Sequence, residues 1–167
     1  QANAYGYDNT VALKAMKELG RSAKGVAVVK PGTPEPELER LTKAGICAVR
    51  IMTLHNGTLG FDVMDEVMAQ VHPFGWHANI QLDGRLLPSY EAQIKRLPGK
   101  FVIDHTGKFL EPVSPDSREF RSLLNLVETG RTEVLDTHEF RLGPGREITQ
   151  RLHIEHLQRL AGADRQV

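Results

Sequence analysis

The chain has 167 residues, of which 40% are hydrophobic and 25% are charged, and its formal net charge at pH 7 is zero. This composition is typical of one globular domain that is large enough to bury a hydrophobic core. A neutral chain lacks the surplus of Lys and Arg that phosphate binding requires, so we expect no nucleic-acid partner. We also expect no membrane partner, because no apolar run approaches the ~20 residues of a membrane-spanning helix.

The sequence contains a single cysteine, Cys47, which excludes an internal disulfide and a cysteine-based zinc site. Its place early in a predicted strand favours a small core residue over a nucleophile. This cysteine usage is typical of a reducing compartment, and we expect a cytoplasmic location.

Short β-rich runs alternate with segments of helical periodicity along the chain. In chain order, we predict a helix at residues 9–19, a strand at 24–29, a helix at 34–44, a strand at 46–52, a helix at 62–71, a strand at 76–82, a helix at 88–96, a strand at 100–104 and a helix at 115–128. This alternation predicts parallel strands joined by right-handed crossovers, as in an open α/β sheet or a (β/α) barrel.

Local signals predict where some of these helices begin and end. Thr33 and Ser114 each precede a proline, which predicts a capping hydroxyl followed by proline in the first helical turn. Gly45 and Gly130 lie where two of the helices should end.

The side-chain alternation in residues 76–83 favours the barrel over the open sheet. Apolar residues point one way and polar residues the other, the polar set being His77, Asn79, Gln81 and Asp83. A central strand of an open sheet is apolar on both faces, whereas a barrel lumen can hold a polar stripe. We therefore predict an α/β protein with a TIM-type (β/α) barrel. A repeat of about 22 to 32 residues supplies five or six of its eight units, so the barrel is incomplete, covering about strands two to seven.

Polar residues gather at the predicted carboxyl ends of the strands, where barrel enzymes place their functional groups. These residues are Asn3, Tyr5, Arg50, His55, Asn56, Gln81, Asp83, Asp104 and His105. They come from four parts of the chain that the fold would bring to one rim.

Two of these residues carry the clearest chemistry. His105, at a strand end beside Gly107, can act as an acid or base or bind a metal, or else it is a hydrogen-bonded histidine of the rim. The guanidinium of Arg50 suits a substrate carboxylate, with an ion pair to Asp83 or Asp104 as the alternative.

Other candidates are weaker. His153 and His156 share a predicted helix face without a third ligand, which favours a solvated surface. The sequence has no GxGxxG or GxxxxGK[ST] motif, which is unfavourable for a nucleotide-binding fold.

The segments at residues 1–9, 45–50, 75–77 and 102–107 follow the order seen in amidohydrolase-related barrels, and the chain resembles amidohydrolase family 2 over about residues 1–131. Its nearest group looks like 2-pyrone-4,6-dicarboxylate hydrolase, 4-sulfomuconolactone hydrolase and D-galactarolactone isomerase. The resemblance implies a hydrolytic or isomerising barrel of a group in which several members work without a metal. We expect a metal-independent hydrolase, a lactonase that uses activated water to break a C–O bond in a small lactone or ring carboxylate, with hydrolysis against isomerisation left open.

The resemblance also implies site residues. His105 and Asp104 would be catalytic, and the substrate-binding residues would be Arg50, Gln81, Asn3, Tyr5 and Asn56. It implies no metal ligand and no cofactor, with a small-molecule carboxylate or lactone as the partner. Gln81 stands where the pyrone hydrolase has a tyrosine, and Asn56 falls near a second substrate arginine there, so we expect a smaller or less charged lactone.

Residues 132–167 diverge from the family, and we expect them to form a separate segment with one strand and a helix. The family's His-x-His pair of strand one would lie upstream of Gln1, and its strand-eight aspartate is absent. We therefore expect a truncated chain that lacks part of the catalytic machinery and does not close its barrel.

Two alternatives remain open at this point. The first is a metal-dependent decarboxylase of the same superfamily, which would hold zinc or manganese. The second is a non-catalytic α/β fragment that binds a ligand or self-associates, because an open half-barrel leaves unpaired strand edges and would form a homo-oligomer.

Overall fold

The structure is a computed structural model that describes residues 3–20 and 22–135 of the 167. The described residues divide into two compact units. Unit 1 comprises those of Gln1–Gln81 with Leu97–Phe101, and unit 2 those of Leu82–Arg96 and Val102–Val167. No helix within these described ranges is long and apolar enough to cross a membrane. The predictions for His153, His156 and the last helix lie outside the described residues.

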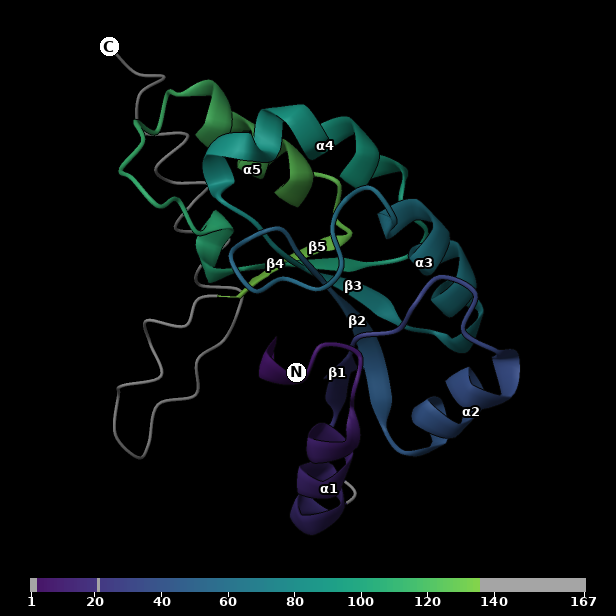
Figure 1. The fold of residues 1–167 in the computed structure, drawn as a ribbon. Helices are drawn as coiled ribbons and strands as arrows, with labels where there is room; N and C mark the ends of the chain where they lie inside the picture. The colour runs from purple at the N-terminus through teal and green to yellow at the C-terminus, as the bar shows by residue number, and fades with distance from the viewer. Residues whose placement is uncertain (1–2, 21, 136–167) are drawn as a thin grey trace. The chain divides into compact units, whose positions relative to one another are not determined.

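Unit 1 contains parallel strands with helices between them (Figure 1). Its elements are the 3-10 helix η1 (Asn3–Tyr5), α1 (Thr10–Leu19), β1 (Gly25–Ala27), α2 (Glu35–Lys43), β2 (Ile46–Met52), α3 (Met64–Val71), the 3-10 helix η2 (His72–Phe74) and β3 (His77–Gln81). β2 lies between β1 and β3 and pairs in parallel with both. The predicted order of helices and strands is therefore confirmed here, except that Asn3 lies in a 3-10 turn and not at the end of a strand.

β2 forms the centre of the hydrophobic core of unit 1. Ala48, Val49 and Ile51 are fully buried along it. α3 buries Met64, Val67, Met68 and Val71, whose i, i+3, i+4, i+7 spacing gives the helix one apolar face. The buried Trp76 keeps its polar group satisfied, since its Nε1 donates to Thr42 Oγ1 at 2.8 Å.

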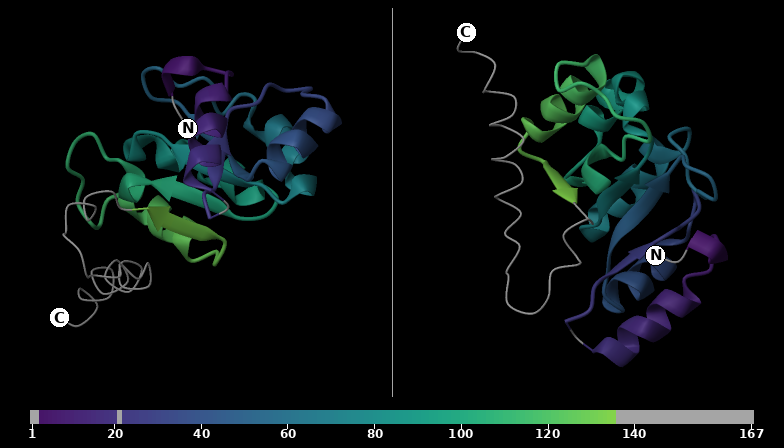
Figure 2. Two further views of the ribbon diagram at one scale, coloured as in Figure 1. Left: turned by 90° about the horizontal axis from the view of Figure 1, so that it is seen from below. Right: turned by 90° about the vertical axis from the view of Figure 1, so that its left-hand side faces the viewer.

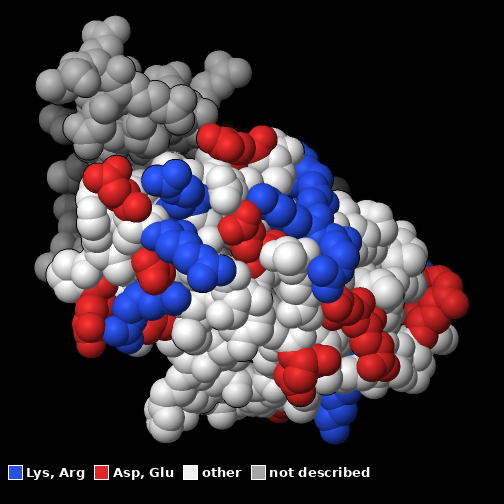
Figure 3. Space-filling view, turned by 90° about the horizontal axis from the view of Figure 1, so that it is seen from above, with Lys and Arg blue, Asp and Glu red and all other residues white. Residues whose placement is uncertain are grey.

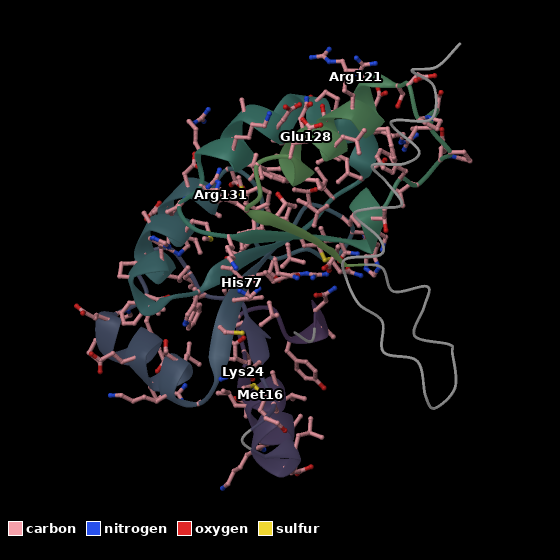
Figure 4. The ribbon with its side chains drawn as sticks, turned by 180° about the vertical axis from the view of Figure 1, so that it is seen from behind. Met16, Lys24, His77, Arg121, Glu128 and Arg131 are labelled. Carbon is pink, nitrogen blue, oxygen red and sulfur yellow. The ribbon has the colours of Figure 1, made fainter. Side chains whose placement is uncertain are left out.

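Gly25 allows α1 to approach the beginning of β1. A Cβ atom at this position would lie 2.4 Å from Sδ of Met16 and 2.6 Å from Cδ1 of Ile46, so these two side chains would have to shift to admit one. Figure 4 labels Met16 of α1 and Lys24, the residue before Gly25. The glycine at the first position of β1 thus lets the Met16 side chain of α1 pack directly against the strand.

Unit 2 contains the 3-10 helix η3 (Gly84–Leu86), α4 (Leu87–Arg96), most of β4 (Phe101–Asp104), the turn η4 (His105–Gly107), α5 (Arg118–Val127) and β5 (Thr132–Leu135). α4 and α5 lie side by side (Figures 1 and 2). Glu91 of α4 accepts hydrogen bonds from Lys95 Nζ at 2.6 Å and from Asn125 Nδ2 of α5 at 3.0 Å. Arg131, labelled in Figure 4, donates from Nη2 to the carbonyl oxygen of Lys95 at 2.5 Å.

The predicted helix-ending glycines are confirmed, whereas the predicted capping roles of Thr33 and Ser114 are wrong. Gly45 and Gly130 have φ values of 100° and 67°, in the left-handed region where glycine ends helices. The Thr33 hydroxyl does not cap α2 but donates to the carbonyl oxygen of Lys30 at 2.7 Å. α5 begins later than predicted, because Ser117 and not Ser114 caps it.

Asn9 precedes α1 but does not cap that helix with its side chain. Its Nδ2 donates to the carbonyl oxygen of Val28 at 2.8 Å, and its Oδ1 accepts from the Val28 N–H at 3.0 Å. One amide side chain thus satisfies both backbone polar groups of the buried Val28, as a neighbouring strand would.

We expect both Asn9→Ala and Asn9→Asp to destabilise the protein by about 1–3 kcal/mol, because each leaves a buried backbone group of Val28 unsatisfied. Asn9→Asp keeps the acceptor for the N–H but places a carboxylate against the carbonyl oxygen. Urea unfolding measures the difference, with Asn56→Asp at an exposed loop position as the control. Equal stabilities of Asn9→Asp and the wild type would contradict this role.

Candidate functional site

Arg50 lies in β2 and is bound by two amide side chains of β3. Its Nη1 donates to Oδ1 of Asn79, and its Nη2 donates to Oε1 of Gln81. The register explains this arrangement, because Arg50 is the β2 partner of Asn79, and Gln81 lies two residues further along the same face. These two bonds fix the orientation of the guanidinium.

The amides that bind Arg50 are themselves buried. Asn79 is 7% exposed and Gln81 is 4% exposed, so neither side chain is well solvated. Buried amides need hydrogen-bond partners, and a guanidinium donates to both in a fixed geometry. The polar stripe predicted for this strand is thus confirmed for Asn79 and Gln81.

The loop after β2 carries Asn56, one of the predicted substrate-binding residues. Asn56 is exposed and has a φ of 69°, which asparagine tolerates better than most residues. The neighbouring Gly57 has no room for a Cβ, which would lie 1.9 Å from the carbonyl oxygen of Met52. Its N–H donates to the carbonyl oxygen of Leu54 at 2.8 Å, so the loop folds tightly back onto the end of β2.

Asn3 and Tyr5, also predicted to bind substrate, lie in η1 of unit 1. Asn3 is exposed, and its Nδ2 lies 3.3 Å from Sδ of Met52, the last residue of β2. Tyr5 is 51% exposed. Asn3 therefore lies beside the carboxyl end of β2, whereas the substrate-binding role of either residue stays a prediction.

The predicted catalytic residues Asp104 and His105 lie at the carboxyl end of β4 in unit 2. Asp104 is the last residue of the strand and is 4% exposed, while His105 is half-buried. From His105 onward the backbone turns left-handed: φ is 55° at His105, 50° at Thr106, 84° at Gly107 and 44° at Lys108. The N–H of Lys108 donates to the carbonyl oxygen of His105 at 2.9 Å and closes the turn.

Asp83, in the segment after β3, binds the side chain of Arg85. Nε and Nη2 of Arg85 donate to Oδ2 of Asp83 at 2.8 and 2.6 Å, and Oδ1 of Asp83 accepts from the Arg85 N–H at 3.1 Å. These side-chain bonds lower the pKa of Asp83 most strongly; burial opposes them, and the N–H groups of Arg85 and Leu110 add to the lowering. Arg85 is a residue that the sequence reasoning did not single out.

The structure therefore brings together part of the predicted rim within each unit. In unit 1, Arg50 meets Gln81 and also Asn79, which was not among the predicted site residues although its alternation with Gln81 signalled it. In unit 2, Asp104 and His105 are adjacent at one strand end. That Arg50 and His105 share one site stays a prediction.

Charged side chains of both signs lie on the surface of the molecule (Figure 3). On the face drawn in Figure 3, Lys and Arg side chains are interspersed with Asp and Glu side chains. Among residues 3–20 and 22–135, no three His, Cys, Asp or Glu side chains are placed together to hold a metal ion.

The parallel strands with intervening helices, and the polar residues at the strand ends, define an α/β fold of the kind found in (β/α) barrels. A family model described as Amidohydrolase matches residues 1–167. The chain belongs to the amidohydrolase family, as the sequence predicted.

Three curated relatives match the chain. It is 32% identical over 130 residues to D-galactarolactone isomerase of Agrobacterium fabrum, which covers 78% of this chain and 44% of the isomerase. It is 32% identical over 130 residues to 2-pyrone-4,6-dicarboxylate hydrolase of Comamonas testosteroni, and this match covers 76% of the chain and 42% of that hydrolase. It is 24% identical over 128 residues to 4-sulfomuconolactone hydrolase of Hydrogenophaga intermedia, covering 75% and 42%. The chain thus spans less than half the length of these relatives.

Solved structures confirm the fold. The apo crystal structure of an Agrobacterium tumefaciens protein matches with a TM-score of 0.80 and 28% identity, covering 98% of this chain and 59% of that protein. A second match is a probable 2-pyrone-4,6-dicarboxylic acid hydrolase of Acinetobacter baumannii with citric acid bound. Its TM-score is 0.72 at 21% identity, and the match covers 99% of this chain and 62% of that protein. The fold is therefore part of a (β/α) barrel, as predicted.

Asp83→Asn should lower the free energy of unfolding by about 1–3 kcal/mol at neutral pH, because it weakens a partly buried charged pair. The pKa of Asp83 is lowered in the fold, so its contribution is present above the ordinary carboxyl pKa of about 3.9 and is lost as the pH falls through the folded value. The difference between wild type and variant should therefore shrink below about pH 4. Urea unfolding at pH 7, 5 and 3 measures it, with Asp116→Asn at an exposed carboxylate as the control. A difference that is constant with pH would contradict the prediction.

Proposed function

We propose that the protein carrying this chain is a lactone hydrolase. Water attacks the lactone carbonyl carbon, the ring C–O bond breaks, and a proton is transferred to the departing ring oxygen, so that the product is a hydroxy acid. Membership of the amidohydrolase family supports this proposal. Two relatives are named as hydrolases of a pyrone dicarboxylate and of a sulfomuconolactone, which gives further support.

The observation that carries the proposal is the orientation of Arg50 by Asn79 and Gln81. A guanidinium fixed by two neutral acceptors can bind a carboxylate with little further loss of side-chain entropy. Arg50 therefore binds the carboxylate of a small lactone in this proposal, and Gln81 contacts the same substrate. Asn3, Tyr5 and Asn56 would add polar contacts near the end of β2.

His105 acts on the reacting carbonyl in this proposal. At the end of β4 an imidazole can polarise the carbonyl oxygen or transfer the proton that the ring oxygen needs. The adjacent Asp104 would assist the imidazole as the second catalytic group. The proposed chemistry uses no cofactor. Metal analysis of the purified protein tests the metal-dependent alternative, since one equivalent of zinc or manganese would favour it.

A lactone isomerase is the second candidate, because one of the relatives at 32% identity is D-galactarolactone isomerase. The two activities can share an attack on the lactone carbonyl and differ in the nucleophile. Water opens the ring in a hydrolase, whereas a hydroxyl of the substrate itself can form a new ring in an isomerase.

Turnover of a carboxylate-bearing lactone in water enriched in oxygen-18 separates the two candidates. A hydrolase places one heavy oxygen in each product carboxylate, and an isomerase that works by an internal hydroxyl places none. We expect incorporation by the full-length protein and a fall in kcat of about 100-fold or more in His105→Gln. His72→Gln, at an exposed histidine, is the control. Turnover without incorporation would refute hydrolysis, and undiminished turnover by His105→Gln would refute the role of His105.

Arg50→Gln should raise KM about 10- to 100-fold for a lactone that bears a carboxylate, because a charged hydrogen bond contributes about 1.5–3 kcal/mol. The KM for a neutral lactone of the same ring size should change little. Steady-state kinetics on the two substrates measure this, with Arg40→Gln on the exposed face of α2 as the control. Equal effects on both lactones would show that Arg50 does not recognise the carboxylate.

A further inference from the structure

The turn that carries His105 has an unfavourable backbone. His105, Thr106 and Lys108 all have positive φ values, and each non-glycine residue in the left-handed region costs about 1–2 kcal/mol. Thr106 is β-branched, which makes this conformation especially unfavourable, and its buried Oγ1 has no hydrogen-bond partner among the described residues. Such a turn persists only where surrounding contacts hold it.

The segment after β3 makes contacts of this kind within unit 2. The N–H of Gly84 donates to the carbonyl oxygen of Lys108 at 3.3 Å, at the end of the turn. A Cβ on Gly84 would lie 2.5 Å from the carbonyl oxygen of Gly107 and 2.6 Å from the ring of Phe109. The two segments are therefore in direct backbone contact, and only glycine fits at residue 84.

Side chains strengthen this connection just beyond the turn. Oδ1 of Asp83 accepts from the N–H of Leu110 at 3.5 Å, a long bond, while Oδ2 binds the guanidinium of Arg85. The third nitrogen of that guanidinium, Nη1, lies 2.8 Å from Oε2 of Glu111. Arg85 thus bridges one carboxylate from each segment, with its planar fork in fixed contact with Asp83.

We propose that Asp83, Arg85 and Glu111 are positioning residues for His105. Asp83 and Arg85 precede the left-handed turn in the chain, and Glu111 follows it. Together they hold the turn, so that the imidazole has one orientation at the end of β4. The reaction served by that orientation rests on the proposed function, whereas the orientation itself can be measured without any substrate.

The exposure of these side chains allows an effect on the turn to be distinguished from an effect on overall stability. The Glu111 side chain is 75% exposed and that of Arg85 is 38% exposed, and exposed ion pairs contribute little to folding. Glu111→Gln should therefore change stability little. Arg85→Lys should remain folded and lose less stability than Asp83→Asn, because it keeps a positive charge beside the partly buried Asp83. Arg40→Lys and Glu37→Gln are the controls, because Arg40 on α2 also donates from Nε and Nη2 to one carboxylate, that of Glu37.

NMR on the folded protein tests the positioning directly. In Arg85→Lys, we expect the Lys108 amide, whose bond to the His105 carbonyl closes the turn, to exchange about tenfold faster with solvent. We also expect the ring resonances of His105 to broaden or to split into two sets. Arg40→Lys should change neither. Wild-type exchange and a single sharp set of His105 resonances in both Arg85→Lys and Glu111→Gln would overturn the proposal.

Kinetics on the full-length protein add a second readout. Arg85→Lys and Glu111→Gln should lower kcat by about 10- to 100-fold with KM nearly unchanged, because a small misplacement of a reacting group affects the chemical step more than substrate binding. Glu111→Asp should recover part of this loss. A mobile turn with an unchanged kcat would overturn the positioning role. If the wild type has no lactonase activity, the proposed function fails, and the NMR result alone decides whether these residues orient His105.

Discussion

The parallel pairing of β2 with β3 is the interaction on which unit 1 depends. It aligns Arg50 with Asn79 and places Gln81 on the same face, two residues nearer the strand end. Both amides are buried, so each needs a partner, and the guanidinium supplies donors to both. The same bonds that satisfy the interior therefore leave a cation oriented at the strand end. The contacts that satisfy the two buried amides are therefore also contacts that orient the group proposed to recognise a carboxylate.

In unit 2, the residue at the strand end lies in an irregular turn and not in a regular sheet. The turn at His105 is unfavourable by itself, and contacts from Gly84 and Arg85 compensate for it. A residue with an unfavourable backbone conformation needs several neighbouring contacts to hold it. Such residues are common where a side chain must face a reacting group. Arg50 is thus oriented by side-chain bonds within a regular sheet, whereas His105 is oriented by the shape of its backbone.

Hydrophobic patterning predicted the strands well, because burial on one face imposes a period that a sequence displays. β2 was placed with its exact ends, and the polar stripe of the next strand was recognised from alternation. Helix starts were less predictable, since Thr33 hydrogen-bonds within its own turn and a serine closer to α5 provides the cap. The left-handed turn was not foreseen, because only Gly107 in it signals positive φ. The role of Arg85 was not predicted for a related reason. Its second partner, Glu111, is distant in sequence and meets it only when the two loops are folded.

The bond pair between Asn9 and Val28 has a consequence for the order in which the protein forms. The two residues are 19 positions apart, so the contact closes a short loop that contains α1 and β1. Closing such a loop is entropically cheap compared with pairing strands from distant parts of a chain. Both residues precede β2 in the chain, so this contact needs no residue of β2 or of any later strand. The asparagine takes the place of a neighbouring strand at Val28, and these two backbone groups are therefore not available for pairing with another chain.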